Sequence, residues 1–422
     1  MKENLSAVLE VMPSRLSGCV ELSGAKNSVL RLLAASILFD DVVRLNNYPS
    51  ELLDVVVHEE MLKILGKKIE HVDGSVIISQ SSNRGGSLIW EGRSIRNTLL
   101  ILGALLTKTG FARVPLPGGC KLGDRKFDIH IDLIKALGGR VWEEDGYLVA
   151  EAEQGKLLGA DVELRLRSTG GTENAILMGC LAEGVTRIFN PHIRPEIVDL
   201  VAFLNNAGAK INIRGQESIV IEGVPKLFGA IHNVMPDNME ALTWLVISSV
   251  TKSQIKIKNF PFEDLEVPLI FLRESGVNLY RCGSDVIVGE GECFPVELST
   301  GPYPGINSDM QPIFAAFAAF ANGKSHIVDL RFPGRYLYAN EMRKMGVDSI
   351  SDGDVLTISG GKPVYSGDVR ALDLRAGIAL LILALGAESG VTKIRDAWQI
   401  FRGYDRLIEK LTALGAKVRY VV

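Results

Sequence analysis

A short segment, LIKALGGRV (133–141), shows the unit from which this chain is built. It reads as the end of an amphipathic helix, then a glycine, then a short strand. Glycine tolerates the left-handed backbone conformation that commonly ends a helix. The pattern recurs six times: MLKILGKKI (61–69), LIKALGGRV (133–141), FLNNAGAKI (203–211), FLRESGVNL (271–279), EMRKMGVDS (341–349) and KLTALGAKV (410–418). The marked glycines are Gly66, Gly138, Gly208, Gly276, Gly346 and Gly415, which follow one another after 72, 70, 68, 70 and 69 residues.

A hairpin signal follows most copies of the segment. Turn residues such as Asp-Gly or Ser-Asp stand beside short apolar strands, as a tight β-hairpin requires. The four clearest examples are DGSVIIS (73–79), DGYLVAE (145–151), ESIVIEG (217–223) and SDVIVGE (284–290). Each unit therefore contains helices and strands that cannot bury their apolar faces alone.

The length of the unit predicts the architecture. Open solenoids usually repeat every 20–45 residues or so, and this unit is longer. We therefore expect an α/β fold of two compact domains with three units each. The sixth unit ends at Val422 without its hairpin, so the strand-like segment 7–24 is predicted to complete it. The predicted domains are 1–25 plus 233–422, which contains both chain ends, and 26–232.

The composition excludes several classes of protein. Hydrophobic residues make up 47% of the chain, charged residues 23%, and the net charge is −4, which argues against a general nucleic-acid binder. The first ten residues lack a signal-peptide core, and no apolar run reaches the roughly 18 residues of a membrane span. The longest run, 376–387, reads as a buried helix. Five scattered cysteines without metal-ligand spacing indicate free thiols in the cytoplasm. No metal, other cofactor or membrane partner is predicted.

Two glycine-containing segments are candidate anion sites. In GAKN (24–27), the start of an apolar helix and the ammonium of Lys26 would both attract an anion. In VPLPGGCKLGDRKFDIH (114–130), Cys120 lies among Lys121, Asp124, Arg125 and Lys126, and cationic neighbours favour the reactive thiolate. The alternatives are a solvated lysine and a surface loop with an incidental cysteine.

A carboxylate and several arginines complete the candidates. Asp309 in GPYPGINSDMQP (301–312) precedes an apolar helix, so it could cap that helix or accept a proton from a substrate hydroxyl. Arginine binds phosphate and carboxylate through two hydrogen bonds, although a single arginine is more often a surface ion pair. The arginines considered are Arg96, Arg335, Arg375 and Arg402.

These segments together resemble a known family. GAKN (24–27), PGGCKLGDRKFDIH (117–130), YPGINSDMQ (303–311), DLRAG (373–377) and RGYDRL (402–407) occur in the order seen in UDP-N-acetylglucosamine enolpyruvyl transferases. The resemblance covers essentially the whole chain, and the cysteine loop is its most specific part. It implies two inside-out α/β barrels of three repeats each, which contribute residues to one active site.

The resemblance also implies roles for individual residues. The substrates would be phosphoenolpyruvate and a uridine nucleotide sugar, and the acceptor hydroxyl would add to carbon 2 before phosphate leaves. Cys120 would donate a proton or assist product release, and Asp309 would be the base. Lys26, Asn27, Arg96, Arg125 and Arg402 would bind phosphoenolpyruvate, with Lys26 and Arg402 also catalytic. The acceptor side would comprise Arg125, Lys126, Phe127, Asp128, His130, Ser168, Thr169, Gly170 and Asp309, and the supporting residues would be Arg335, Asp373 and Arg375.

Departures from the family pattern concern mainly the acceptor side. They are Lys126, Thr169, Gly171 and Phe401, where the family usually has Pro, Val, Ala and Asp. Two alternatives therefore remain beside the main interpretation. One is a related enolpyruvyl transferase that acts on another uridine nucleotide, such as UMP, and the other is a catalytically silent binding protein.

Overall fold

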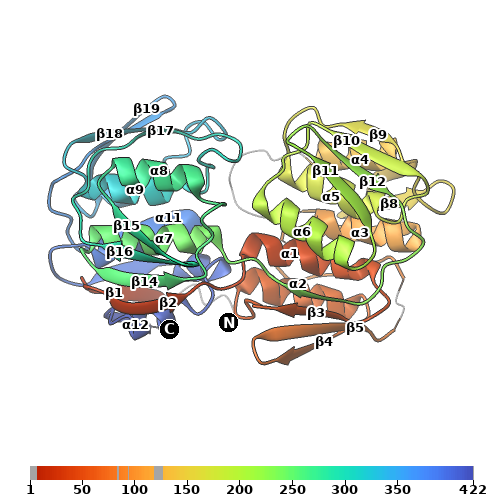
Figure 1. The fold of residues 1–422 in the computed structure, drawn as a ribbon, viewed down its shortest axis with the longest axis horizontal. Coiled ribbons are helices and arrows are strands. Elements are labelled where there is room, and N and C mark those ends of the chain that lie inside the picture. Colours follow the sequence, from red (N-terminus) through yellow and green to blue (C-terminus); the bar gives the residue numbers. More distant parts are fainter. Residues whose placement is uncertain (1–6, 83–84, 94, 118–126, 422) are drawn as a thin grey trace. The chain divides into compact units, whose positions relative to one another are not determined.

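The computed structural model describes residues 7–82, 85–93, 95–117 and 127–421. In this part of the chain two compact units are formed. Unit 1 contains the described parts of Met1–Ser23, Glu51–Leu53 and Pro236–Val422, and unit 2 contains those of Gly24–Ser50 and Asp54–Met235. Both units combine helices with short strands (Figure 1).

The six expected repeats are present, and five of them follow the order strand, helix, strand, helix, strand, strand. In five sheets the strands are ordered first, second, fourth, third, with the first pair parallel and the other pairs antiparallel. All six predicted helix-ending glycines have a left-handed φ, between 80° and 94°. The prediction of the repeat from its glycine is therefore confirmed.

Unit 2 contains three repeats. The repeat of Gly66 comprises β13 (Ala230–Asn233), α1 (Lys26–Ala35), η1 (Ser36–Leu38), β3 (Val43–Asn46), α2 (Leu53–Ile64), β4 (Lys67–Val72) and β5 (Ser75–Gln80). The repeat of Gly138 comprises α3 (Thr98–Thr109), β6 (Phe111–Pro115), α4 (Asp128–Ala136), β7 (Gly139–Glu144) and β8 (Tyr147–Ala152). The repeat of Gly208 comprises β9 (Asp161–Glu163), α5 (Thr169–Gly179), β10 (Val185–Phe189), α6 (Pro195–Asn206), β11 (Lys210–Arg214) and β12 (Ser218–Glu222). In the Gly138 repeat a single parallel bridge from Ser87 to Arg113 replaces the first strand.

Unit 1 contains the other three repeats. The repeat of Gly276 comprises β2 (Ser17–Glu21), α7 (Asn238–Val250), β14 (Gln254–Lys258), α8 (Glu266–Glu274), β15 (Asn278–Cys282) and β16 (Asp285–Gly289). The repeat of Gly346 comprises β17 (Glu297–Ser299), α9 (Gln311–Phe320), β18 (Lys324–Val328), α10 (Tyr338–Arg343), β19 (Asp348–Asp352) and β20 (Val355–Ser359). The repeat of Gly415 comprises β21 (Asp368–Arg370), α11 (Leu374–Leu385), β22 (Thr392–Arg395), η2 (Ala397–Arg402), α12 (Leu407–Ala413), β23 (Val418–Val421) and β1 (Val8–Val11).

The N-terminal segment is divided between two repeats. Strand β1 pairs with β22 and β23 and so completes the last repeat, as predicted. Strand β2 pairs instead in parallel with β14 and supplies the first strand of the Gly276 repeat. The expectation that the whole segment 7–24 belongs to the last repeat was therefore wrong for β2. A strand pairs wherever its backbone hydrogen bonds are satisfied, and the repeat signal does not specify that position.

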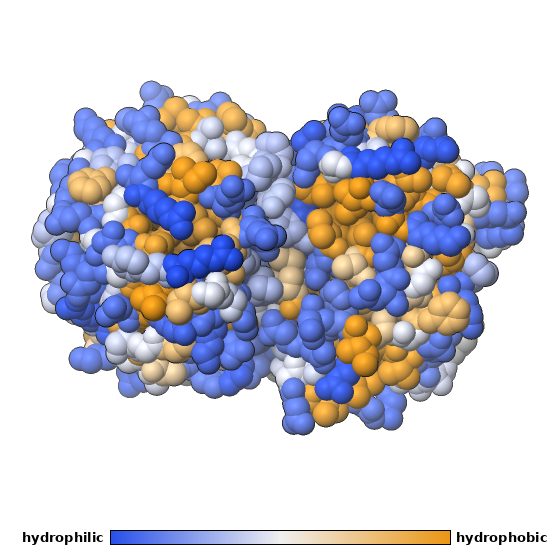
Figure 2. Space-filling view, in the orientation of Figure 1, coloured by the Kyte–Doolittle hydropathy of each residue, from blue (hydrophilic) through white to orange (hydrophobic). Residues whose placement is uncertain are grey.

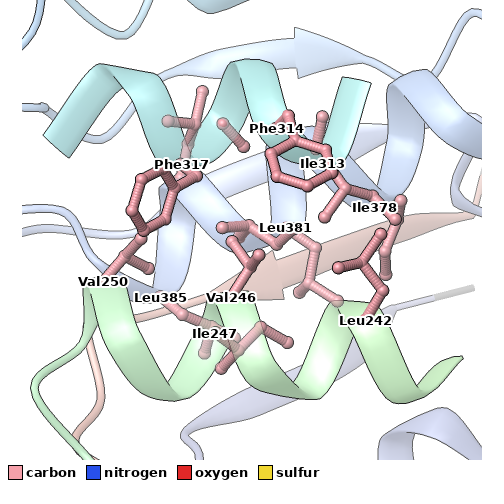
Figure 3. Close-up of a cluster of buried hydrophobic side chains, with 14 of the residues drawn as sticks. Leu242, Val246, Ile247, Val250, Ile313, Phe314, Phe317, Ile378, Leu381 and Leu385 are labelled. Atoms are coloured by element: carbon pink, nitrogen blue, oxygen red, sulfur yellow. The ribbon is translucent and has the colours of Figure 1, made fainter. Parts of the chain in front are cut away.

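The first helix of each repeat lies inside its unit and the sheets lie outside, so each unit is an inside-out α/β barrel. In unit 1 these helices are α7, α9 and α11, and every residue of α7 and α11 is buried. Figure 3 shows how they pack, with Leu242, Phe314 and Leu381 among the meeting side chains. Helix α11 contains the long apolar run, which is confirmed as a buried helix.

The inner helices of unit 2 are α1, α3 and α5, and their packing includes polar groups. A Cβ at Gly103 of α3 would lie only 1.9 Å from the Oδ1 atom of Asn174 on α5. The side chain of Asn97, just before α3, donates to the backbone oxygen of Leu30 in α1 at 2.9 Å. Gly103 thus permits α3 to lie close to α5, and the side chain of Asn97 connects the start of α3 to α1.

The surfaces of both units mix hydrophilic and hydrophobic side chains (Figure 2). Exposed apolar residues include Val42 and Ile231 in unit 2, and Leu337 and Ile350 in unit 1. Across the described residues, no helix has the length and apolar character needed to cross a membrane.

Candidate active site

The centre of the unit 1 site is Asp309, two residues before α9. Its Oδ1 accepts a hydrogen bond from Arg335 Nη1 at 3.1 Å, and its Oδ2 lies 3.6 Å from Arg375 Nε. Both guanidinium groups are buried, whereas 41% of the Asp309 side chain is exposed. The residue before α9 is Met310, and no side chain caps this helix. Asp309 is therefore an accessible carboxylate between two cations, and the helix-cap alternative was wrong.

Arg335 is oriented by a loop that another carboxylate organises. Buried Asp329 accepts hydrogen bonds from Ser308 Oγ at 2.5 Å and from the backbone nitrogens of Arg331 and Phe332 at 3.0 and 2.9 Å. Arg335 in turn donates to Ser308 Oγ at 3.0 Å and to the Ser308 backbone oxygen at 3.3 Å. Asp329 thus connects Ser308, the residue before Asp309, with the loop that carries Arg335.

Arg375 occupies the first turn of α11, and Asp373 caps this helix. The Oδ1 atom of Asp373 accepts from the backbone nitrogens of Arg375 and Ala376, both at 2.8 Å. Burial acts to lower the pKa of Arg375, but Asp309 and Tyr404 outweigh it and raise that pKa. Burial also raises the pKa of Tyr404 to about 12, so its phenol stays protonated. Arg375 therefore adjoins Asp309 directly, and Asp373 lies 3.8 Å from Nη2 of Arg335; their supporting role stays a prediction.

Arg402 ends η2 and is half-buried. Its Nη1 donates to Gln399 Oε1 at 3.1 Å. The neighbouring Phe401 is buried and packs edge-on against the ring of Tyr420, with ring centroids 5.1 Å apart. Phe401, one of the departures from the family pattern, thus packs in the hydrophobic core of unit 1.

In unit 2, Lys26 is the first residue of α1 and is held by a carboxylate. Its Nζ lies 2.8 Å from Asp54 Oδ2, and only 13% and 6% of the two side chains are exposed. The solvated-lysine alternative was therefore wrong. The next residue, Asn27, hydrogen-bonds the side chain of Glu196 and helps to keep the pKa of that buried carboxyl low.

Two further buried carboxylates and arginines continue this polar group. Arg31 Nε lies 2.5 Å from Glu173 Oε1, and Arg194 Nη2 lies 3.1 Å from Glu196 Oε1. Burial raises the pKa of Glu173, and the charge of Arg31 opposes that rise. Burial acts to raise the pKa of Glu196 as well. The charge of Arg194 and the hydrogen bonds that Glu196 accepts outweigh burial, so the pKa of Glu196 is lowered. The first salt bridge thus joins α1 to α5, and the second lies at the start of α6.

The charge of Arg96 acts on His130. Arg96 is half-buried and lies two residues before the first residue of α3. Burial first, and then the charge of Arg96, lower the pKa of His130 to about 4. His130 is therefore neutral at physiological pH. A Cβ at Gly170, near the start of α5, would lie 3.4 Å from His130 Nε2, so these two predicted acceptor residues adjoin.

The remaining predicted acceptor residues lie around the starts of α4 and α5. Phe127 precedes α4 and Asp128 begins it, with Asp128 Oδ2 2.7 Å from Arg165 Nη2. Ser168 caps α5 by accepting from the Gly171 backbone nitrogen at 3.1 Å, and Thr169 Oγ1 is 3.0 Å from His192 Nδ1. A shallow groove lies nearby but contains none of the predicted residues; it is lined by Ile129, Asp132, Leu133, Ala136, Asp161, Val162, Glu163, Leu164 and Arg165.

Some predicted residues cannot be placed. Cys120, Lys121, Asp124, Arg125 and Lys126 lie outside the described residues. The other four cysteines are free thiols, of which Cys19 and Cys282 are exposed. Within the ranges that the structure describes, no three His, Cys, Asp or Glu side chains are grouped so as to hold a metal ion.

Several residues that contact the candidate site residues were not predicted from the sequence. Asp54 and Asp329 are single carboxylates in ordinary helix and loop contexts, so no motif marks them. His58 and His130 each precede the repeat glycine by eight residues, which is a signal that an alignment of the repeats would have found. Their asparagine partners, Asn97 and Asn174, differ in repeat position, and only packing reveals them.

Comparison with known proteins gives a consistent result. The model of the EPSP synthase (3-phosphoshikimate 1-carboxyvinyltransferase) family matches residues 11–411. A UDP-N-acetylglucosamine 1-carboxyvinyltransferase 2 from Carboxydothermus hydrogenoformans is 38% identical and covers 96% of this chain and 97% of its own. A UDP-N-acetylglucosamine 1-carboxyvinyltransferase from Caulobacter is 36% identical, with 97% and 95% covered.

Solved structures agree in fold. The enolpyruvyl transferase NikO from Streptomyces tendae matches with a TM-score of 0.88 and 27% identity, covering 99% of both chains. An EPSP synthase from Acinetobacter baumannii matches with a TM-score of 0.76 and 16% identity, covering 99% of this chain and 100% of that one, which supports the fold alone. Since the family model and relatives above 30% identity span nearly the whole sequence, the chain belongs to the EPSP synthase (3-phosphoshikimate 1-carboxyvinyltransferase) family of enolpyruvyl transferases.

Proposed function

We propose that this protein transfers the enolpyruvyl group of phosphoenolpyruvate to the 3-hydroxyl of UDP-N-acetylglucosamine and releases phosphate. The observation that carries the proposal is Asp309, an accessible carboxylate held between the buried guanidinium groups of Arg335 and Arg375. The names of relatives at 34–38% identity support the acceptor. The reaction would be the first committed step of peptidoglycan precursor synthesis, with consequences for cell wall, cell shape and cell division.

The chemistry needs a base for the acceptor hydroxyl. Asp309 takes the hydroxyl proton while the oxygen adds to carbon 2 of phosphoenolpyruvate and carbon 3 gains a proton. The adjacent cations, Arg335 and Arg375, favour the ionised carboxylate that such a base must be. The tetrahedral adduct then loses a proton from carbon 3 and expels phosphate, which restores the double bond. Asp309 also lies close enough to its arginines to be fixed in position before the substrate arrives.

Phosphoenolpyruvate carries nearly three negative charges, and cations must hold them. Lys26, Arg96 and Arg402 supply positive charge from the described part of the chain, and Arg125 adds one from the cysteine loop. Fixed charges act strongly where water is excluded. The salt bridge to Asp54 holds Lys26 at the start of α1, where the helix N-terminus also favours an anion. Asn27 would help to bind phosphoenolpyruvate, and the predicted acceptor residues would orient the nucleotide sugar.

Cys120 would donate the proton to carbon 3 or assist product release, and it would be the target of fosfomycin, an epoxide that mimics phosphoenolpyruvate. No metal or other cofactor takes part in the proposed reaction. A cytoplasmic location remains the expectation from the thiol content of the sequence.

Phosphate release from phosphoenolpyruvate, measured with a panel of acceptors, tests the proposal. Release with UDP-N-acetylglucosamine, and not with UMP, UDP or other UDP-sugars, is the expected result. Release only with UMP or another nucleotide would show that the proposed acceptor is wrong and that the proposed reaction, enolpyruvyl transfer, is right. No release with any acceptor, from protein that is folded by circular dichroism, would overturn enolpyruvyl transfer itself.

A further inference from the structure

One buried asparagine of unit 2 contacts a predicted acceptor residue. The Nδ2 atom of Asn174, on α5, lies 3.0 Å from the Nδ1 atom of His130, on α4. Asn174 is fully buried and His130 is 5% exposed. In a neutral imidazole one ring nitrogen carries hydrogen and the other accepts, so the partner of Nδ1 determines the state of Nε2.

The packing of α3 fixes which end of the Asn174 amide faces the histidine. The Oδ1 atom points at Gly103, where an added Cβ would lie 1.9 Å away. Oδ1 has no conventional donor among the described residues. An oxygen can still make weak Cα–H contacts with a glycine, whereas an NH₂ group turned to that side would bury two donors without an acceptor. The amide NH₂ therefore faces His130, and Nδ1 accepts.

A histidine at the same position in another repeat also has an asparagine partner, and the orientation of that amide is fixed by a different contact. His58 lies eight residues before Gly66, as His130 lies eight residues before Gly138. The Nδ2 atom of Asn97 lies 3.0 Å from His58 Nδ1 and donates to the Leu30 backbone oxygen at 2.9 Å. Because a carbonyl oxygen can only accept, Nδ2 must face this way, and His58 Nδ1 must also be an acceptor.

We propose that Asn174 is a positioning residue that holds His130 as the Nε2–H tautomer, so that His130 donates a hydrogen bond to an oxygen of the bound nucleotide acceptor. Nε2 faces Gly170 at the start of α5, and it has no hydrogen-bond partner among the described residues. The inference rests on the proposed function for the identity of the ligand, but the tautomer itself does not depend on it.

The low pKa of His130, about 4, agrees with this assignment. A neutral donor binds an oxygen through a directed hydrogen bond without adding charge beside Arg96. The two histidines, which occupy equivalent repeat positions, then differ in use. The Nε2 atom of His58 is buried without a partner among the described residues, so it packs in the interior, whereas Gly170 leaves the Nε2 edge of His130 without a side chain over it.

Nitrogen-15 NMR of the wild-type protein labelled in its histidine rings tests the tautomer directly. We expect a pyrrole-type Nε2 and a pyridine-type Nδ1 for both His130 and His58, with the His130 signals assigned from their loss in His130→Gln. In Asn174→Asp the carboxylate can only accept, so Nδ1 of His130 should gain a proton while His58 is unchanged. A protonated Nδ1 at His130 in the wild-type protein would refute the proposal, whether or not any variant folds.

A double-mutant cycle tests the use of the donor. Glutamine keeps an N–H donor near the position of Nε2 whatever residue 174 is. Asn174→Asp should lower kcat/KM for the nucleotide acceptor about 10- to 100-fold in the wild-type background, mainly through KM, and change it less than 3-fold in the His130→Gln background. An equal loss in both backgrounds would show that Asn174 is only structural. Failure of every acceptor in the panel would overturn the proposed function but leave the NMR result standing.

Discussion

At the scale of single residues, the arrangement around Asp309 allows a specific prediction about the catalytic base. Two buried arginines share one exposed carboxylate, so the loss of that charge affects both catalysis and the arginines. Asp309→Asn should lower kcat about 100- to 1,000-fold, because the base for the acceptor hydroxyl is lost. Steady-state phosphate release measures this loss. Asp368→Asn, which breaks an exposed carboxylate–Arg395 pair of the same unit, is the control and should retain activity.

A decrease of less than 5-fold in Asp309→Asn would exclude Asp309 as the base. The same variant should also unfold at a lower temperature than Asp368→Asn. It removes the carboxylate charge beside buried Arg375 and leaves buried Arg335 with only the Asp373 carboxylate, 3.8 Å away, which is costly, whereas an exposed pair contributes little. Differential scanning calorimetry of both variants gives this comparison.

The reactivity of Cys120 can be predicted from its neighbours in the sequence, although it lies outside the described residues. Fosfomycin, in the presence of the acceptor, should alkylate Cys120 and spare the exposed Cys19 and Cys282, which peptide mass spectrometry can resolve. Cys120→Asp should resist alkylation and remain active, because a carboxylic acid can also donate a proton. Equal labelling of Cys19, Cys282 and Cys120 would contradict a specific role for Cys120.

At the scale of elements, the loop that carries Arg335 depends on Asp329. This carboxylate accepts four hydrogen bonds, from Thr300, Ser308, Arg331 and Phe332. Asp329→Ala should lower the free energy of unfolding by about 2–4 kcal/mol, since buried donors lose their acceptor. It should also lower kcat at least 10-fold through displacement of Arg335. Chemical denaturation and kinetics on the folded variant check the two effects, and unchanged kcat would separate the loop from catalysis.

The contact between α3 and α5 depends on the absence of a side chain at Gly103. Gly103→Ala should destabilise the protein by about 1–3 kcal/mol, despite the better helix propensity of alanine, because its Cβ overlaps Asn174 Oδ1. Urea denaturation measures the change. Gly301→Ala, where an added Cβ meets nothing within 4 Å, is the matched control. A Gly103→Ala protein as stable as that control would show that α5 can move away at no cost.

At the scale of the whole molecule, two buried histidines make stability depend on pH. The pKa of His58 is lowered to about 3 and that of His130 to about 4, in both cases mainly by burial, from an ordinary value of 6.5. Between pH 6.5 and these values the unfolded chain binds protons that the native protein does not. Stability should therefore fall as the pH falls through this range, by on the order of 3 kcal/mol for each histidine.

Denaturation of wild-type protein and of His58→Gln between pH 7 and pH 4 tests this pH dependence. The slope of the free energy of unfolding against pH should be smaller in His58→Gln. Replacing the half-exposed His326 with glutamine should leave the slope unchanged. Parallel profiles for wild type and His58→Gln would show that His58 is not the group responsible.

Much of the fold follows from the sequence because its signals are local. A glycine that ends a helix and an Asp-Gly turn act within a few residues, and all six such glycines have the expected backbone conformation. The apolar run of α11 likewise predicts burial without knowledge of its neighbours. The candidate residues Lys26, Asp309 and Arg375 could be selected by residue type and motif, since phosphate and carboxylate chemistry requires cations and a base.

The pairings between distant segments are decided only by the tertiary structure. The division of the N-terminal segment between β22–β23 and β14, the salt bridge of Lys26 with Asp54, and the hydrogen bonds of Asp329 with Thr300 and Ser308 all join residues from different segments of the sequence. The same holds for the hydrogen bond between Asn174 and His130. A sequence pattern determines what a segment can form locally, whereas its partner depends on which buried groups must satisfy one another once the chain is packed.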